Sequence, residues 1–374
     1  MNFKQNIFFR TSFQAFFSTL NKIVRKKKDR IVLYSNWGFR DNVEYLFKFL
    51  VNNNYNERYE IICASNDFLG LEKKHYKNTK FVSNKIHILY YFLSSKYFFY
   101  CFGGLPITPA KEQIVVNLWH GMPIKKVGLL ETNATHKRLN YFSYILSYSD
   151  FFSDIIKKSF DVDDSKILVA NAPRNEALLV PENKNSKKKY IVWMPTYRSS
   201  KQLNSINGSE NEILPLIKSE SELQIIDELL NRNDEVLFVK LHPLQDYTHF
   251  SKNYENIRFI DDKWLKTNQT GLYEFLAESE ALITDYSSIS IDYVLLNKPI
   301  FYILDDIELY KKNRGLNFTL EQFIAGNIIN DFNEFSNIFL EKDNFKALRK
   351  DKEELFYDNK YHGSKYILNI VGIV

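Results

Sequence analysis

The stretch from Ala281 to Phe301 constrains the fold of this chain more than any other segment. It reads as a short apolar strand over 281–284, a polar turn over 285–288, a helix of about two turns, and a second apolar strand after Pro299. Two strands joined by a helix form a βαβ unit and lie parallel in one sheet. The segment therefore predicts an α/β protein with a corner where a strand end meets a helix amino end, and such corners bind phosphate.

The turn of this unit carries groups that suit an anion. Asp285, Ser287 and Ser288 are good N-cap residues, and the two hydroxyls can donate to phosphate oxygens together with the unpaired backbone N–H groups. The same residues can also serve only to cap the helix. Because no Gly-rich loop is present, the local pattern by itself favours this capping alternative.

Length and charge limit the classes of protein to which the chain can belong. A chain of 374 residues is long enough for two domains, each with its own core. With 45% hydrophobic and 25% charged residues it is globular, and a net charge of +5 is too balanced for a dedicated nucleic-acid binder. Cys63 and Cys101 lie in apolar strand-like runs, which indicates buried thiols in a reducing cytoplasm rather than a disulfide or a metal pair.

The first residues predict an amphipathic helix. No secretory signal is expected, since Lys4 and Arg10 interrupt the apolar residues, and no apolar run of about 18 residues predicts a membrane span. Asn21 falls off the apolar face, and a basic run over 25–28 follows the helix. The helix either anchors on anionic lipid, or it packs on its own domain with the Lys run as a solvated linker. The face is formed by Phe3, Ile7, Phe13, Phe17, Leu20 and Val24.

From Arg30 onward, strand and helix patterns alternate, which predicts parallel sheets with helices on both faces. Ligands of such sheets bind beyond the carboxyl ends of the strands. A polar segment over 181–189 is expected to link two halves. Strands are expected at 31–35, 59–64, 80–83, 97–102, 113–118, 141–148, 166–170, 190–194, 236–241 and 258–260, and helices at 42–51, 86–93, 151–160, 220–231 and 272–277.

Polar groups follow several of these strands. After the fifth strand, Gly121 and Pro123 fix a tight backbone behind His120, which holds the imidazole at the strand tip, and Lys125 adds positive charge. A lone histidine is usually structural, but this one is well placed for chemistry. In the second half, three successive strand ends carry groups that converge on a multiply charged anion such as a nucleotide pyrophosphate. They are Thr196 with Arg198, then His242, then Asp285 with Ser287 and Ser288.

These residues carry a resemblance to a known family. The ordered motif set resembles that of the CDP-glycerol glycerophosphotransferase family, which holds teichoic-acid primases and polymerases and related capsule enzymes. The resemblance runs from about the first strand to the segment 357–364. Its motifs are Trp119-His-Gly-Met-Pro123, Lys125-Lys126-x-Gly128, Pro173-Arg-Asn175, Pro195-Thr-Tyr-Arg198, Leu241-His-Pro243 and Thr284-Asp-Tyr-Ser-Ser288 with Asp292-Tyr293.

The resemblance implies a fold and a reaction. It implies a GT-B-like arrangement of two Rossmann-like α/β domains with a cleft between them, and the amphipathic helix predicted above precedes this arrangement. Family members transfer a polyol phosphate from a CDP-activated donor to a hydroxyl of a lipid-linked glycan and release CMP at the cytoplasmic face of the membrane. The expected division is a membrane-association helix over 1–29, an acceptor-side domain over 30–186, a donor-nucleotide domain over 187–354, and a C-terminal helix over 355–374 that crosses back to the first domain.

The resemblance also implies roles for individual residues. His120 matches the acceptor-side histidine and is expected to act as general base, whereas His242 matches the donor-side histidine. No metal and no cofactor is expected. The expected partners are CDP-glycerol or CDP-ribitol, a lipid-linked or cell-surface glycan, and the anionic inner surface of the cell membrane. The expected donor-binding residues are Thr196, Arg198, Thr284, Asp285, Ser287 and Ser288, and the expected acceptor-side residues are Asp41, Asn42 and Lys125.

Departures from the family pattern leave alternatives open. Met122 stands where many members have Thr, Asn171 stands where a Gly commonly precedes the Pro-Arg-Asn motif, and 325–327 replaces a Pro-Gly-Pro run. The last departure weakens the prediction of which polyol is transferred more than it weakens the prediction of the reaction class. A GT-B nucleotide-sugar glycosyltransferase of polysaccharide or capsule synthesis remains an alternative, and a non-catalytic scaffold of a polysaccharide assembly complex is a more distant one.

Overall fold

The structure is a computed structural model that describes residues 7–374 with internal gaps. The gaps are 69, 132–133, 135–138, 181–188, 196–198, 201–204, 207–213, 241–253 and 341–342. Only the backbone is described for residues 7–10, 13, 199, 200, 205 and 206.

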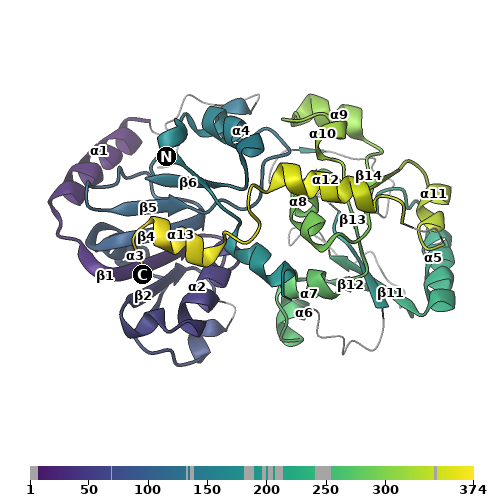
Figure 1. Cartoon of the computed structure of the whole chain (residues 1–374), viewed down its shortest axis with the longest axis horizontal. Helices are drawn as coiled ribbons and strands as arrows, with labels where there is room; N and C mark the ends of the chain where they lie inside the picture. The colour runs from purple at the N-terminus through teal and green to yellow at the C-terminus, as the bar shows by residue number, and fades with distance from the viewer. Residues whose placement is uncertain are drawn as a thin grey trace.

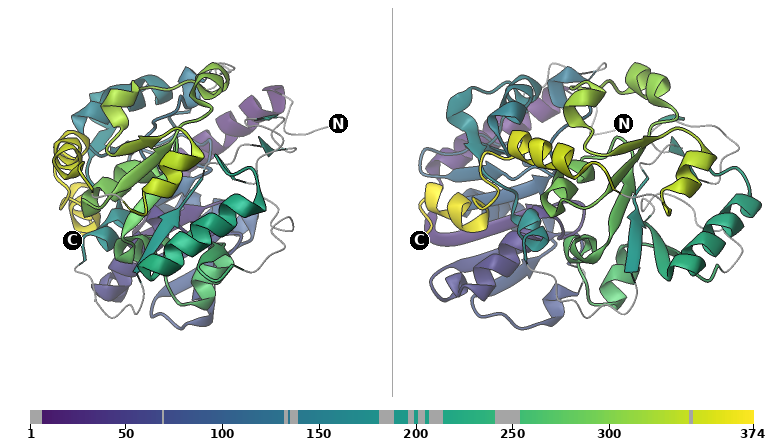
Figure 2. Two further views of the ribbon diagram at one scale, coloured as in Figure 1. Left: turned by 90° about the vertical axis from the view of Figure 1, so that its right-hand side faces the viewer. Right: turned by 45° about the vertical axis from the view of Figure 1, so that its right-hand side comes forward.

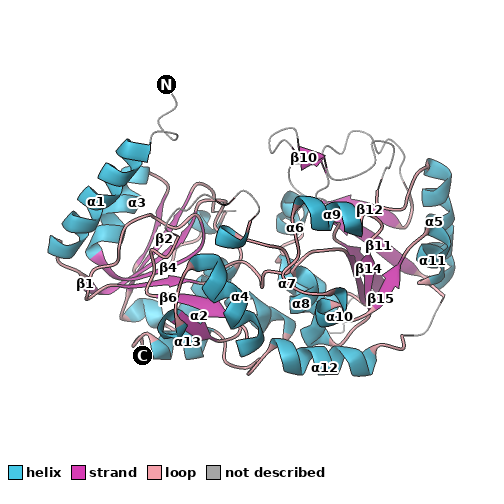
Figure 3. Ribbon diagram, turned by 90° about the horizontal axis from the view of Figure 1, so that it is seen from above, coloured by secondary structure: helices cyan, strands magenta, loops and turns pink. Residues whose placement is uncertain are grey.

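The first half of the chain builds a seven-stranded parallel sheet (Figure 1). Its strand order is β3-β2-β1-β4-β5-β6-β7. Figure 3 shows α1 and α3 on one face of this sheet and α2 on the other. The strands are β1 Lys27–Ser35, β2 Glu60–Ser65, β3 Thr79–Val82, β4 Ser95–Phe102, β5 Ile114–Asn117, β6 Tyr144–Ser147 and β7 Ile167–Val169, and the helices are α1 Ile7–Ile23, α2 Asn42–Asn52, α3 Lys85–Ser94 and α4 Asp150–Phe160.

The second half builds a six-stranded parallel sheet in the order β12-β11-β8-β13-β14-β15. A short antiparallel pair, β9 Ser199–Ser200 with β10 Ser205–Ile206, lies outside it. The strands are β8 Lys189–Trp193, β11 Glu235–Lys240, β12 Ile257–Ile260, β13 Ala281–Thr284, β14 Ile300–Ile303 and β15 Asn327–Ile329. The helices are α5 Glu220–Asn233, α6 Asp262–Thr267, α7 Leu272–Glu278, α8 Ile289–Tyr293, α9 Ile307–Asn313, α10 Leu320–Phe323 and α11 Phe332–Asn337.

The βαβ unit read from the sequence occupies the middle of the second sheet. Every residue of β13 is buried, as expected for a strand covered on both faces. Its neighbour β8 pairs with it in parallel, with Val192 opposite Leu282, and β11 lies on the other side of β8. The carboxyl ends of β8, β11 and β13 therefore meet at one edge, and the expected α/β fold with two parallel sheets is confirmed.

Segments from both ends of the second half join it to the first. The 3-10 segment η5, Pro173–Leu178, packs between α2 and α7. In Figure 1 and Figure 2, α12 (Lys346–Phe356) runs beside both halves, and α13 (Ser364–Ile370) lies against the first sheet. The Tyr97 hydroxyl of β4 donates to the Gly372 carbonyl at 3.2 Å, which fixes the end of the chain there.

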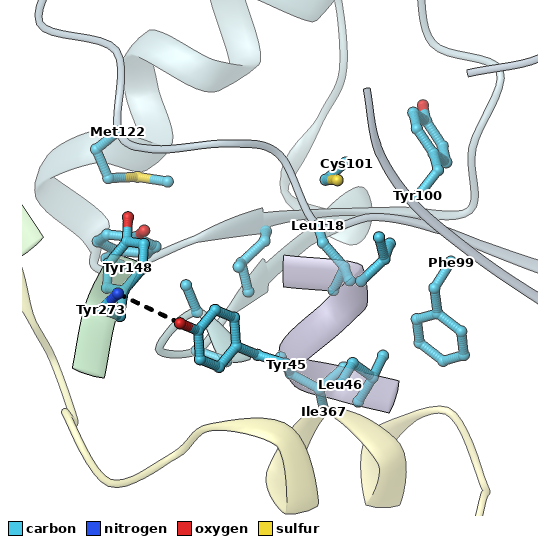
Figure 4. Packing of buried hydrophobic residues seen from close by; sticks show 14 of the residues in the cluster. Tyr45, Leu46, Phe99, Tyr100, Cys101, Leu118, Met122, Tyr148, Tyr273 and Ile367 are labelled. Atoms are coloured by element: carbon cyan, nitrogen blue, oxygen red, sulfur yellow. Dashed lines mark hydrogen bonds between the residues drawn. The ribbon is translucent and has the colours of Figure 1, made fainter. Parts of the chain in front are cut away.

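Aromatic side chains fill the boundary between the halves. Figure 4 shows Tyr45 of α2 facing Tyr273 of α7, where the Tyr273 backbone N–H donates to the Tyr45 hydroxyl at 3.3 Å. Their rings meet edge to face at 5.7 Å. Nearby, Tyr148 stacks on Tyr357 from the segment after α12. The two halves therefore pack against each other through aromatic side chains and are not joined by the linking chain alone.

The second half of α1 packs on its own domain. Phe17, Leu20 and Val24 lie against the core of the first half. Asn21, which the sequence placed off the apolar face, is fully buried and donates to the Gln113 side-chain oxygen at 2.7 Å. For this part of the helix, the alternative of a helix packed on its own domain therefore holds.

The basic run after α1 corrects a second expectation. It does not form a solvated linker, because Lys26 is buried and its ammonium donates to the Asn21 side chain at 2.8 Å. Strand β1 begins directly afterwards, at Lys27. Among the helices that the structure describes, none has the length and apolar character needed to cross a membrane. Cys63 and Cys101 are buried free thiols, as the sequence indicated.

Candidate active site

The turn after β13 leaves hydroxyl groups for a ligand. Thr284 is fully buried and its hydroxyl donates to the Met194 carbonyl at 3.0 Å, so it ties the ends of β13 and β8 together. Ser288 is the N-cap of α8 but makes no side-chain capping hydrogen bond. Ser287 accepts only a long hydrogen bond of 3.5 Å from the Ile289 N–H within the described residues. Helix capping therefore does not account for the two hydroxyls.

His120 lies in a strained loop after β5. The backbone of Trp119 has a φ of 53° and that of Gly121 a φ of 120°, and both angles are unusual for a chain of L-residues. The Asn42 amide holds this loop by donating to the carbonyls of Leu118 at 3.1 Å and Trp119 at 2.9 Å. The buried Asn42 side chain, at the start of α2, thus stabilises the strained backbone of this loop.

The imidazole of His120 packs against two aromatic rings. It stacks on Phe102 with the ring centroids 4.7 Å apart, and the Trp119 ring lies 4.1 Å away. Its Nδ1 is buried and has no hydrogen-bond partner among the described residues. This burial lowers the pKa of His120 to about 4, while the nearby Asp41 acts in the opposite direction. The imidazole is therefore neutral at pH 7 and able to accept a proton.

The His120 loop and the Ser288 turn are in contact. A Cβ added to Gly121 would lie closer than 3.0 Å to the Ser288 hydroxyl oxygen and 2.9 Å from Nη2 of Arg174. The loop belongs to the first sheet and the turn to the second. The structure therefore brings the loop that carries His120 next to the turn that carries Ser287 and Ser288, which the sequence had placed at separate strand ends.

Lys125 lies in a loop of the first half whose backbone pairs with a segment of the second half. The backbone around it pairs with the segment 315–317, through the Lys126 N–H to the Gly315 carbonyl at 3.1 Å and the Asn317 N–H to the Ile124 carbonyl at 2.8 Å. Burial lowers the pKa of Lys125, the nearby Arg314 lowers it further, and Asp285 acts in the opposite direction. Lys125 was expected on the acceptor side, and the structure places it beside Asp285, an expected donor-binding residue.

Arg174 is the centre of a buried ionic network between the halves. Its Nη1 donates to both carboxylate oxygens of Asp41, at 2.9 and 2.7 Å, and its Nη2 donates to Asp292 at 2.6 Å. The Tyr273 hydroxyl donates to the same Asp292 oxygen at 2.8 Å. Asp41 comes from the start of α2, Asp292 from α8 and Arg174 from η5. The network therefore ties both halves to the segment that joins them.

Asp41 and Asn42 are held by this network. Asp41 faces Arg174, and the Asn42 side-chain oxygen accepts from the Arg174 backbone N–H at 3.3 Å. Asn42 is fully buried, so its observed contacts are with the protein. Asn42 thus holds the His120 loop directly, whereas Asp41 holds Arg174.

Three expected site residues lie outside the described part of the chain. They are Thr196 and Arg198, which follow β8, and His242, which follows β11.

Three residues of the site received no role from the sequence: Arg174, Asp292 and Arg314. Arg174 and Asp292 stand in the quoted motifs, but charge and position alone do not reveal that two residues so far apart form one ion pair. Arg314 became noticeable only through its proximity to Lys125.

Two cavities lie away from this site. One of ≈ 750 Å³ and another of ≈ 370 Å³ lie beside α2 and α7 and share Lys48, Glu274 and Glu278. Neither is lined by His120 or Ser288.

Comparisons with known proteins agree with this arrangement. The family model of the CDP-Glycerol:Poly(glycerophosphate) glycerophosphotransferases matches residues 16–365. The teichoic acid glycerol-phosphate primase of Bacillus subtilis (strain 168) is 28% identical over 289 residues, which cover 72% of this chain and 69% of that protein. The teichoic acid ribitol-phosphate primase of Bacillus spizizenii is 26% identical over 258 residues, and the match spans 62% of each chain, less than two thirds of that primase.

A solved structure supports the fold. The structure of the wall teichoic acid polymerase TagF superimposes with a TM-score of 0.70 at 20% identity, over 96% of this chain and 92% of that chain. At this identity the likeness establishes the GT-B-like α/β architecture. The family match supplies the identity, because it covers almost the whole chain. The chain belongs to the CDP-Glycerol:Poly(glycerophosphate) glycerophosphotransferase family, a family of transferases.

Proposed function

We propose that this enzyme transfers a polyol phosphate, namely glycerol phosphate, from a CDP-activated donor to a hydroxyl of a lipid-linked or cell-surface glycan and releases CMP. One observation carries the proposal: the loop of the neutral His120 touches the turn that presents Ser287 and Ser288. An unprotonated imidazole thus lies on a loop that adjoins groups suited to phosphate. The glycerol-phosphate and ribitol-phosphate primases among its relatives support a polyol phosphate as the transferred group.

The chemistry follows from these groups. The acceptor hydroxyl attacks the phosphorus that bears the polyol, His120 takes the hydroxyl proton, and the bond from that phosphorus to the oxygen of CMP breaks. General-base assistance of this kind contributes roughly 10²–10⁴-fold. The Ser287 and Ser288 hydroxyls, with the cations Lys125 and Arg314 near Asp285, stabilise charge on the donor phosphates. We assign Thr196, Arg198 and His242 to the same donor side.

The proposed division of the chain gives each half one substrate. Residues 30–186 form the acceptor side, residues 187–354 bind the donor nucleotide, and residues 355–374 return to the first half. The two separate parallel sheets and the contact of Tyr97 with Gly372 support this division.

We assign the outer face of α1 to peripheral association with the anionic inner face of the cell membrane. Phe16 and Ile23 on this face are 63% and 77% exposed, and Ile86 on the neighbouring α3 is also exposed. Lys22 and Arg25 supply exposed positive charge beside them. Exposed apolar side chains with basic neighbours favour the interface of an anionic bilayer.

Vesicle sedimentation tests this membrane surface. The variant Phe16→Ser/Ile23→Ser should sediment less with phosphatidylglycerol vesicles than the wild type, whereas Leu309→Ser, at an exposed leucine of α9, should not differ. Equal sedimentation of the wild type and the α1 variant would argue against this surface.

The reaction is tested by product release from purified enzyme. With a synthetic lipid-linked glycan acceptor, CDP-glycerol should yield CMP, and the acceptor should gain the mass of one or more glycerol phosphates. CDP-ribitol and UDP-sugars serve as competing donors. Release of UDP with sugar addition would instead establish a nucleotide-sugar glycosyltransferase. No release with any donor, together with unchanged cellular function of His120→Ala, would favour a non-catalytic scaffold.

A further inference from the structure

An exposed tryptophan stands at the end of a row of rings that leads to His120. Trp37, in the loop after β1, is 60% exposed, and its ring stacks on Phe102 at a centroid distance of 6.2 Å with the planes 15° apart. Phe102 in turn stacks on the His120 imidazole at 4.7 Å with the planes 28° apart. The Trp37 ring is therefore one ring removed from the proposed base, and most of its own surface faces solvent.

The loop that carries Trp37 is held in place. The Gly38 N–H donates to the Asn66 side-chain oxygen at 2.9 Å, and the Phe39 N–H donates to the Asp67 carbonyl at 2.6 Å. Asn36 packs against Gly103, which has a φ of 62° and whose missing Cβ would overlap the Asn36 amide. Trp37 is thus presented on a supported loop, and its exposure is a property of the fold.

The surroundings of the indole are polar. Asn36, Asn66 and Gly103 are all exposed. The Asn36 side-chain amide makes no hydrogen bond with any residue that the structure describes. A large aromatic face beside an unengaged amide suits a ligand with one apolar face and hydroxyl groups at its edge. A pyranose ring has this character, because its polarised C–H bonds can meet the negative face of an aromatic ring while its hydroxyls bond to amides.

We propose that Trp37 is a stacking platform for a sugar ring of the acceptor, one unit behind the hydroxyl that reacts at His120. This inference rests on the proposed function and adds a chemical class to the acceptor side of the site. The donor groups lie on the turn after β13 in the second half, whereas Trp37 lies at the carboxyl end of β1 in the first. A lipid surface fits less well, since the neighbours Asn36 and Asn66 are polar.

Two synthetic acceptors that differ in one sugar ring test the contribution of that ring to binding. They share the lipid and the terminal hydroxyl-bearing unit, and the next unit is a pyranose in one and an acyclic ether of similar length in the other. Trp37→Ala should raise the KM for the pyranose acceptor by about 3- to 10-fold. It should leave the KM for the acyclic acceptor and for CDP-glycerol unchanged. Trp37→Phe, which keeps an aromatic face, should restore most of the loss.

Controls make the result specific. Tyr361→Ala removes another exposed aromatic ring, in the segment before α13, and should leave both acceptors unaffected. An equal rise in KM for both acceptors, or no rise for either, would overturn the platform. Weaker sedimentation of Trp37→Ala with phosphatidylglycerol vesicles, without a dependence on the sugar ring, would assign the tryptophan to lipid and also overturn it.

A binding measurement separates this inference from the reaction. If the wild type releases no CMP with either acceptor, the proposed function fails, and the platform is then tested without turnover. Saturation-transfer NMR with the lipid-free, pyranose-containing head group should show transfer from the wild type and much less from Trp37→Ala. Equal transfer from the two proteins, or none from the wild type, would count against the platform.

Discussion

Gly121 and Ser288 touch across the boundary between the two sheets so closely that no side chain fits between them. A Cβ at Gly121 would lie closer than 3.0 Å to the Ser288 hydroxyl oxygen. Gly121 directly follows His120 in the strained loop, and Ser288 occupies the N-cap position of α8 without a side-chain capping hydrogen bond. The contact therefore fixes the distance between the proposed base and the proposed phosphate-binding turn.

Substitution of Gly121 should separate these two loops. Gly121→Ala adds a methyl group where there is no room and places an L-residue at a φ of 120°, so we expect a fall in kcat/KM of roughly 10²-fold, as for other small misplacements of reacting groups. Gly372→Ala is the matched control, because Gly372 also has a positive φ but its added Cβ would meet only the Tyr97 hydroxyl, at 4.0 Å. Similar kcat/KM losses in both variants would point to backbone strain rather than to the contact.

The pKa of His120 predicts an unusual acid limb of activity. Because burial lowers this pKa to about 4, the base should stay neutral well below pH 6.5, and kcat/KM should fall only as the pH approaches 4. His120→Ala should lower kcat by roughly 10²–10⁴-fold with little change in the KM for the donor. An acid limb near pH 6.5, or near-normal turnover in His120→Ala, would show that another group is the base.

The same shift predicts a dependence of stability on pH. The pKa of His120 is lower in the folded state than the ordinary 6.5, so the unfolded chain binds a proton more readily. The stabilisation from the neutral imidazole, whose Nδ1 is buried, is thus complete above pH 6.5 and is lost as the pH falls from 6.5 towards 4. The Tm of His120→Gln should therefore drop less between pH 7 and pH 5 than that of the wild type. His87→Gln replaces an exposed histidine of α3 and should behave like the wild type.

The sequence revealed the strands better than the contacts between them. Strand β13 runs over Ala281–Thr284 as expected, because a short, mostly apolar run between polar turns is typical of a buried strand in an α/β fold. The position of His120 at a strand tip also followed from the pattern. The pairing of Arg174 with Asp292 did not, since a sequence shows which residues carry charge but not which charges meet. The short helices α6 and α9 to α11 were missed because such short segments show too little apolar periodicity.

The Arg174 network predicts a large effect on stability. Arg174→Met leaves the buried Asp292 and the half-buried Asp41 without their cation and should lower the free energy of unfolding by about 3–5 kcal/mol in urea titrations. Arg174→Lys keeps the charge but not the planar fork, and should fall between this variant and the wild type. Arg232→Met disrupts an exposed pair with Glu228 and should cost less than about 1 kcal/mol. Equal losses for Arg174→Met and Arg232→Met would show that the buried network does not stabilise the junction.

Ser287 and Ser288 should act on the donor and not on the acceptor. Neither hydroxyl is used in a strong hydrogen bond within the described residues, so removal of both should cost little stability. If they bind the donor phosphates, Ser287→Ala/Ser288→Ala should raise the KM for CDP-glycerol by about 10-fold or more, since a hydrogen bond to a charged group contributes about 1.5–3 kcal/mol. The KM for the glycan acceptor should change far less. Ser336→Ala, at a half-buried serine of α11, is the control. An unchanged KM for the donor would return the two serines to the role of ordinary residues at a helix start.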